Sequence, residues 1–134
     1  MKKKILFNID CGIFLNNILV SVGNEHKDIY KYIKRVNSGW FLKAFKEDEE
    51  LFNKCKNNNL AFILLSKEYK GIIILHLNEY KDNFESIKTL CHEIHHIVWE
   101  VSKMKGFTEE YEAKAYLFED LLDKIHNCII KRLK

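Results

Sequence analysis

The feature that most constrains this chain is the pattern His-Glu-x-x-His, in which His92, Glu93 and His96 are the fixed positions. Two histidines four residues apart on a helix lie about 40° apart around its axis, one turn above the other. Both imidazoles can therefore reach one metal ion. The carboxylate of Glu93 points to the same side, where it can take a proton from a metal-bound water.

The residues around this pattern predict how the helix packs. On a helical wheel the apolar residues fall in one arc, and the three motif residues fall on the opposite side. The apolar positions are Leu90, Cys91, Ile94, Ile97, Val98 and Val101. This favours a helix with a buried back and a metal-competent front; the alternative is a surface helix that carries its histidines by chance. We expect the helix to start near Asn83 or Ser86 and to end at Gly106, a C-terminal cap.

The bulk composition limits the class of protein. A length of 134 residues suits a single domain over 1–134. The composition is that of an ordinary globular protein, with 47% hydrophobic and 31% charged residues. The net charge is only +3, and nearly all the positively charged residues are Lys instead of Arg. Neither feature gives a reason to expect a nucleic-acid partner. We expect reduced thiols, because the four cysteines are too far apart for a Cys-x-x-Cys motif. They are Cys11, Cys55, Cys91 and Cys128.

We expect neither a secretion signal nor a membrane span. Asn8 and Asp10 interrupt the apolar run at the N-terminus, and no small-residue cleavage site follows it. No run approaches the roughly 18 apolar residues of a transmembrane helix. The expected location is therefore the cytoplasm, without membrane association.

Hydrophobic periodicity predicts the other elements. Strands are expected at 5–9, 13–15, 18–22, 60–65 and 71–77, with hairpins at Asn16-Asn17 and through 66–70. Helices are expected at 24–36 and, after the acidic run 46–50, around Leu51, Phe52 and Cys55. The aromatic stretch 40–45 fits a core segment between elements better than a wall that contacts a ligand.

A long amphipathic helix is expected after the motif helix. Thr108 is its expected N-cap, and apolar residues then recur at steps of four and three. These residues are Tyr111, Ala115, Phe118, Leu122, Ile125 and Ile129. Together the elements predict an α+β domain, in which an antiparallel or mixed sheet packs on the motif helix and on this C-terminal helix.

Catalytic zinc usually takes three protein ligands and leaves one position open, so a third ligand must be found. Trp99 and Ser102 stand where a longer histidine motif has Gly and a third His, which excludes that arrangement. A glutamate is the alternative. Glu112 is favoured, because small neighbours let its helix approach closely, and Glu109 is second. Glu100, one turn beyond His96, is a local rival whose ordinary interpretation is a solvated residue.

A resemblance to a known family rests on two runs. His92-Glu93-Ile94-His95-His96, followed after fifteen residues by Glu112-Ala113-Lys114-Ala115-Tyr116, resembles the gluzincin arrangement. More narrowly, residues 70–122 are similar to small zincin-like proteins of phages and mobile elements, related to the ImmA/IrrE group of metallopeptidases. The resemblance implies a zincin-like fold, with His92, His96 and Glu112 as zinc ligands and Glu93 as general base. It also implies that strand 71–78 is the sheet edge beside the cleft, where an extended substrate pairs.

These observations predict a zinc metallopeptidase, with Zn²⁺ as cofactor, that hydrolyses a peptide bond in a cytosolic peptide or regulatory protein. Tyr116, one turn after Glu112, is the candidate donor to the oxyanion, with a packing tyrosine as its alternative. The alternative function is a non-catalytic zincin-fold binding protein, a phage or mobile-element accessory that captures a protein partner. A helical interaction protein with a chance motif is the third hypothesis.

The other histidines carry simpler expectations. His95 lies between the two helix faces and is expected to make a contact instead of binding metal. His76 alternates with apolar residues and is expected to be packed inside. His26 and His126 are expected at the surface.

Overall fold

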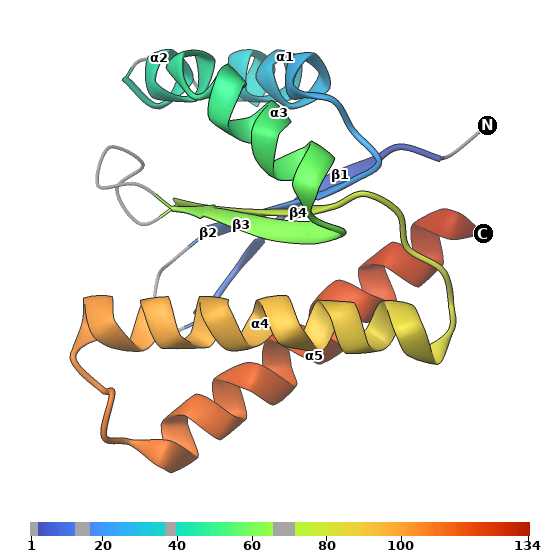
Figure 1. Ribbon diagram of the computed structural model, residues 1–134. Coiled ribbons are helices and arrows are strands. Elements are labelled where there is room, and N and C mark those ends of the chain that lie inside the picture. The colour runs from blue at the N-terminus through green and yellow to red at the C-terminus, as the bar shows by residue number, and fades with distance from the viewer. Residues whose placement is uncertain (1–2, 13–16, 37–39, 66–71) are drawn as a thin grey trace.

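The computed structural model describes residues 3–12, 17–36, 40–65 and 72–134. In this part of the chain a four-stranded mixed sheet carries helices on both faces, which confirms the expected α+β class (Figure 1). The strands are β1 (Ile5–Asp10), β2 (Asn17–Val22), β3 (Ala61–Leu65) and β4 (Ile72–Leu77). The helices are α1 (His26–Val36), α2 (Trp40–Glu47), α3 (Glu49–Asn58), α4 (Phe84–Lys105) and α5 (Tyr111–Leu133). Helices α1–α3 cover one face of the sheet, and α4 and α5 cover the other.

The centre of the sheet is the pair β2 and β4. The strand order is β1-β2-β4-β3, with β2 and β4 parallel and each edge strand antiparallel to its neighbour. Parallel neighbours need a long crossover connection, and α1, α2, α3 and β3 all lie between these two strands in sequence. The prediction that strand 71–78 forms the sheet edge is therefore wrong: β4 has a neighbour on each side, and the edge strands are β1 and β3.

The N-terminal hairpin differs from the predicted one. β2 pairs with β1, in a register that includes Asp10↔Asn17, instead of with a strand at 13–15. Asn17 is thus the first residue of β2 and not part of a two-residue turn. Residues 13–16 lie outside the described residues. β3 and β4 pair antiparallel, as predicted. The predicted hairpin connection 66–70 also lies outside the described residues.

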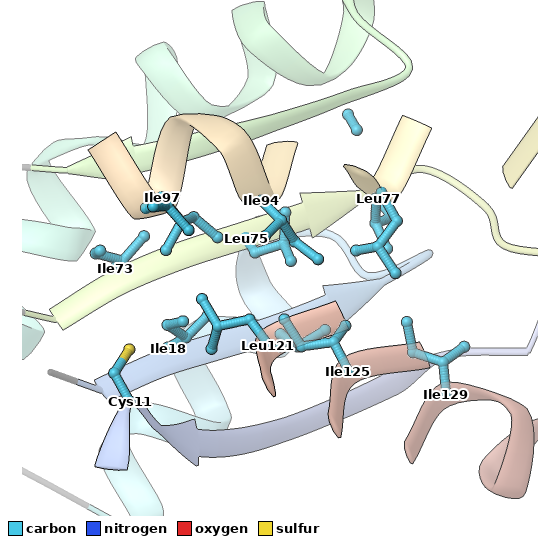
Figure 2. Close-up of a cluster of buried hydrophobic side chains, with 14 of the residues drawn as sticks. Cys11, Ile18, Ile73, Leu75, Leu77, Ile94, Ile97, Leu121, Ile125 and Ile129 are labelled. Carbon is cyan, nitrogen blue, oxygen red and sulfur yellow. The ribbon is translucent and has the colours of Figure 1, made fainter. Parts of the chain in front are cut away.

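Successive side chains of a strand point to opposite faces of the sheet, so the hydrophobic core has two parts, one on each face. Ile73, Leu75 and Leu77 of β4 point toward α4 and α5, as Figure 2 shows. They meet apolar residues of both helices, among them Ile94, Ile97, Leu121, Ile125 and Ile129. Ile74 and His76 point to the opposite face, which α1–α3 cover.

Helix α4 begins and ends where the sequence predicts. The Asn83 side chain accepts a hydrogen bond from the Ser86 N–H at 2.9 Å, which caps the first turn. Gly106 has a φ of 75° and ends the helix. The buried residues are Leu90, Glu93, Ile94, Ile97, Val98, Val101 and Ser102, which confirms most of the predicted apolar arc. Cys91 is only partly buried.

Helix α5 starts later than predicted, at Tyr111 instead of near Thr108. The Glu110 N–H donates to the Phe107 carbonyl at 3.0 Å, so a turn precedes the helix. The buried residues of α5 are Leu117, Leu121, Ile125 and Ile129, a stripe at steps of four. The predicted stripe is therefore confirmed only in its C-terminal half, and Tyr111 is 72% exposed.

The aromatic stretch 40–45 belongs to α2. Ala44 and Phe45 are buried against the face of the sheet that α1 and α3 share, as the prediction of a core segment requires. Within the described residues, no helix combines the length and apolar character needed to cross a membrane.

Candidate metal centre

The two flanks of α4 face different neighbours. The flank that carries His92, Glu93 and His96 borders the edge strand β3, and the two elements line an open depression of about 550 Å³. The opposite flank, with His95 and Trp99, faces α5. The apolar back between the flanks packs against the sheet. The helix therefore presents its motif residues toward β3 and away from α5.

The imidazoles of His92 and His96 converge on the exposed side of α4. Their Nε2 atoms lie 3.2 Å apart, and the ring planes form an angle of 78°. Two nitrogen ligands of a tetrahedral zinc, each about 2.0–2.1 Å from the metal, would lie roughly 3.3–3.4 Å apart. The pair therefore fits two neighbouring coordination positions of one metal ion.

Glu93 lies beside this pair in a drier environment. The residue is 7% exposed, whereas both histidines are exposed. Burial raises the pKa of the Glu93 carboxyl, and the nearby imidazoles of His92 and His96 act in the opposite direction. A raised pKa makes a carboxylate a stronger proton acceptor, which suits a general base.

The outer edge of β3 forms the facing wall of the depression. At the end of the β3–β4 ladder, the Leu60 carbonyl accepts a hydrogen bond from the Asn78 N–H at 3.0 Å. Since hydrogen-bonding direction alternates along an antiparallel strand, every second residue from Leu60 onward directs its backbone groups to β4. The residues between direct theirs to the outer edge, and they line the depression: Ala61, Ile63 and Leu65. An extended segment can pair with such an edge as an added strand.

Of the three glutamates considered as third ligand, one lines the depression and two do not. Glu100 lines the same depression as the two histidines, and its side chain also pairs with Lys103 at 3.0 Å. Glu109 and Glu112 are exposed and do not line the depression. In the part of the chain that the structure describes, no three or more His, Cys, Asp or Glu side chains are grouped to hold a metal ion. Glu112 as third ligand stays a prediction.

Tyr116, like Glu112, is not part of the lining of the depression. It is 67% exposed. Its helix, α5, crosses α4 obliquely and packs on β1 toward its C-terminal end (Figure 1). Its role as oxyanion donor stays a prediction.

The remaining histidines each contact another side chain of the fold, and one of them corrects an expectation. His95 packs on Phe118, with ring centroids 4.7 Å apart, as the expected contact requires. His76 is fully buried, as predicted. His26 was expected at the surface but is 6% exposed, because its ring stacks on Phe45 at 4.2 Å and its Nε2 contacts the Phe45 carbonyl oxygen. His126 is only partly buried and meets the Tyr80 hydroxyl at 2.7 Å.

The sequence does not reveal that β3 borders this site. The apolar run 60–65 predicts a strand, but its composition does not tell an edge strand from a central one. The one usable signal is its position directly before β4, which makes it the hairpin partner of that strand.

No protein-family model, no curated protein and no solved structure matches this chain. The site is therefore interpreted from its own geometry and chemistry.

Proposed function

We propose that this protein is a small zinc-dependent metallopeptidase with a zincin-like fold. The observation that carries the proposal is the convergence of His92, Glu93 and His96 in one open depression beside the outer edge of β3. Two close imidazoles suit zinc, a buried carboxylate suits a general base, and a strand edge suits an extended peptide.

Each of these residues would have one role in hydrolysis. His92 and His96 would hold the metal through Nε2, with a glutamate as third ligand. Zinc, when bound, would act as a Lewis acid that polarises a carbonyl and lowers the pKa of water. Glu93 would accept a proton from the attacking water and pass it to the leaving amine as the C–N bond breaks. Tyr116 is the proposed donor to the oxyanion.

The substrate class follows from β3. The outward backbone groups of Ala61, Ile63 and Leu65 would pair with an extended segment and fix its register next to Glu93. A folded helix offers no free backbone groups for such pairing. The proposed substrate is therefore a cytosolic peptide, or an extended segment of a regulatory protein.

Zinc binding is measured first, by elemental analysis of the protein after loading and desalting. We expect about one zinc per chain in the wild type and loss of zinc in His92→Ala and His96→Ala. His95→Ala is the matched control, because this neighbouring histidine faces α5 and should leave zinc in place. No zinc in the wild type, or equal loss in His95→Ala, would contradict the proposed centre.

The third ligand is identified by a second series, Glu112→Gln, Glu109→Gln and Glu100→Gln. The variant that removes the ligand should lose the largest factor in zinc affinity, at least about tenfold. Equal affinity in all three would show that none of these carboxylates binds the metal.

Catalysis is measured on a defined pool of synthetic peptides by mass spectrometry. Glu93→Gln keeps the size of the side chain but cannot accept a proton, so cleavage should fall at least about 100-fold while zinc stays bound. Cleavage at the same rate by both proteins would overturn the peptidase proposal.

A non-catalytic zincin-fold binding protein is the second candidate. The observation that favours it is that neither Glu112 nor Tyr116 lines the depression that His92, Glu93 and His96 line. In this case the edge of β3 would capture an extended segment of a protein partner, and zinc would be structural or absent. A zinc-loaded protein that shows no Glu93-dependent cleavage would support this candidate.

A further inference from the structure

A second concave surface lies on the flank of α4 that faces α5. This groove has a volume of about 460 Å³, and the proposed metal site does not use it. We call it the α4–α5 groove. Its lining residues are His95, Val98 and Trp99 from α4, and Tyr111, Lys114, Ala115, Phe118 and Glu119 from α5.

The α4–α5 groove exposes aromatic surface that the fold does not bury. Trp99 is 49% exposed and Tyr111 is 72% exposed. Phe118 is partly buried under the ring of His95, and the small side chain of Ala115 leaves room beside it. Exposed Trp and Tyr side chains in a concave site are typical anchors of protein–protein interfaces.

The charges along the α4–α5 groove are separated. The Lys114 Nζ lies 4.7 Å from the centroid of the Tyr111 ring and 5.6 Å from that of Trp99, which Lys103 also approaches at 5.9 Å. Lys103 is already in an ion pair, whereas Lys114 forms none with any described residue. Glu119 is five residues further along α5, about 7.5 Å away along its axis. Along the α5 wall, Lys114 therefore lies in the half of the groove that holds the Tyr111 and Trp99 rings, and Glu119 lies at the opposite end.

We propose that the α4–α5 groove binds an amphipathic helix of a protein partner, whose acidic end lies over Lys114. A third helix laid along two packed helices can place apolar side chains on Trp99 and Phe118 at helical spacing. The ammonium of Lys114 attracts a carboxylate, and Glu119 repels one at the other end. Charge complementarity thus selects the kind of helix and its direction.

The test uses two fluorescent synthetic helical peptides that share one apolar face and differ at one end, where one carries Glu and the other Lys. By fluorescence anisotropy, the wild-type chain should bind the Glu peptide at least about tenfold more tightly than the Lys peptide. Lys114→Glu should reverse this preference. Lys88→Glu, the same charge change in the first turns of α4, should keep it.

Equal affinity for the two peptides, saturable binding of neither, or no effect of Lys114→Glu in a protein that still melts cooperatively would overturn the proposal. A dimer of the free chain that dissociates in Lys114→Glu would assign the groove to a second copy and would also overturn it. Glu93→Gln and removal of zinc should leave peptide binding unchanged, so the outcome is independent of the metallopeptidase proposal.

Discussion

His76 shows how one side chain determines a buried network. Its Nε2 lies 3.1 Å from the Asn78 side-chain oxygen, and its Nδ1 lies 3.0 Å from the Ser21 hydroxyl. The Asn78 amide nitrogen donates to two backbone carbonyls, so its oxygen must accept. Hence the Nε2–H of His76 donates to Asn78, and Nδ1 accepts from Ser21. The ring is therefore held in its neutral form with both nitrogens satisfied.

This network predicts a loss of stability in acid. Burial lowers the pKa of His76 from 6.5 to about 4. The unfolded chain therefore takes up the proton at a higher pH than the folded protein does. Above pH 6.5 both states are neutral at this residue. Stability falls as the pH drops below 6.5 and levels off below about 4, with a loss of about 3 kcal/mol from this residue.

The measurement is urea unfolding at several pH values between 7 and 4, for the wild type and for His76→Gln. The other titrating groups are common to both proteins, so the difference in unfolding free energy isolates His76. We expect the wild type to lose its advantage over the variant as the pH falls. Parallel curves would show that His76 takes up its proton equally in both states.

For single residues, the sequence predicts contacts between side chains that are close in sequence. It does not predict contacts with a residue that is distant in sequence. The spacing of His92 and His96 alone predicts their convergence, because one helical turn separates them. The burial of His26 depends on Phe45, which belongs to another helix. No pattern near His26 indicates that partner.

Two glycines with positive φ terminate elements in different surroundings. Gly106 ends α4 with a φ of 75° and has open space where a Cβ would lie, whereas Gly23 ends β2 with a φ of 69°. A Cβ on Gly23 would lie 3.2 Å from the Lys3 carbonyl oxygen. Gly106→Ala should cost about 1–2 kcal/mol from backbone strain alone, and Gly23→Ala should cost more.

Thermal unfolding of the two alanine variants and of Gly106→Asn checks this order. Asn tolerates the left-handed conformation better than Ala, so Gly106→Asn should be the mildest of the three. An equal loss in Gly23→Ala and Gly106→Ala would mean that the backbone near Lys3 shifts without cost.

The edge strand gives a test of substrate pairing. The Ile63 N–H points to the outer edge of β3, so proline at this position removes no bond of the β3–β4 ladder. Under the proposed function, Ile63→Pro should keep zinc but lose peptide cleavage at least about tenfold. Ile63→Ala is the control, because it shortens the side chain and keeps the N–H. Full cleavage by Ile63→Pro would exclude pairing at this residue.

The sequence predicts most helices and strands, but it does not predict which strands lie next to each other in the sheet. Caps and periodicity define α4 to within a residue or two, because Asn83 and Gly106 act within one turn of its ends. The order of the strands is different, since β2 and β4 meet across a crossover of three helices and a strand. Apolar runs of similar length do not show which strand is central, and the edge role of β3 follows only from the assembled sheet.

For the whole molecule, bound zinc should act on global stability. A ligand that binds only the folded chain stabilises it by about 2.7 kcal/mol at a hundredfold excess over its Kd, which raises the melting temperature by several degrees. We expect this shift in the wild type and in His95→Ala and its absence in His92→Ala. A shift of equal size in His92→Ala would place the bound metal elsewhere.

The packing of α5 on β1 brings the two ends of the described chain together. The guanidinium carbon of Arg132 lies 4.5 Å from the centroid of the Phe7 ring, and Figure 1 shows both ends on the same side of the molecule. A short linker could therefore join them, and new ends could be opened in the turn at 106–110. In such a circular permutant α5 would be synthesised before β1, and α4 would form the new C-terminus. Helix α4 would still line the depression together with β3. Its direct chain connection to α5 would be lost, so only side-chain packing would hold the two helices together.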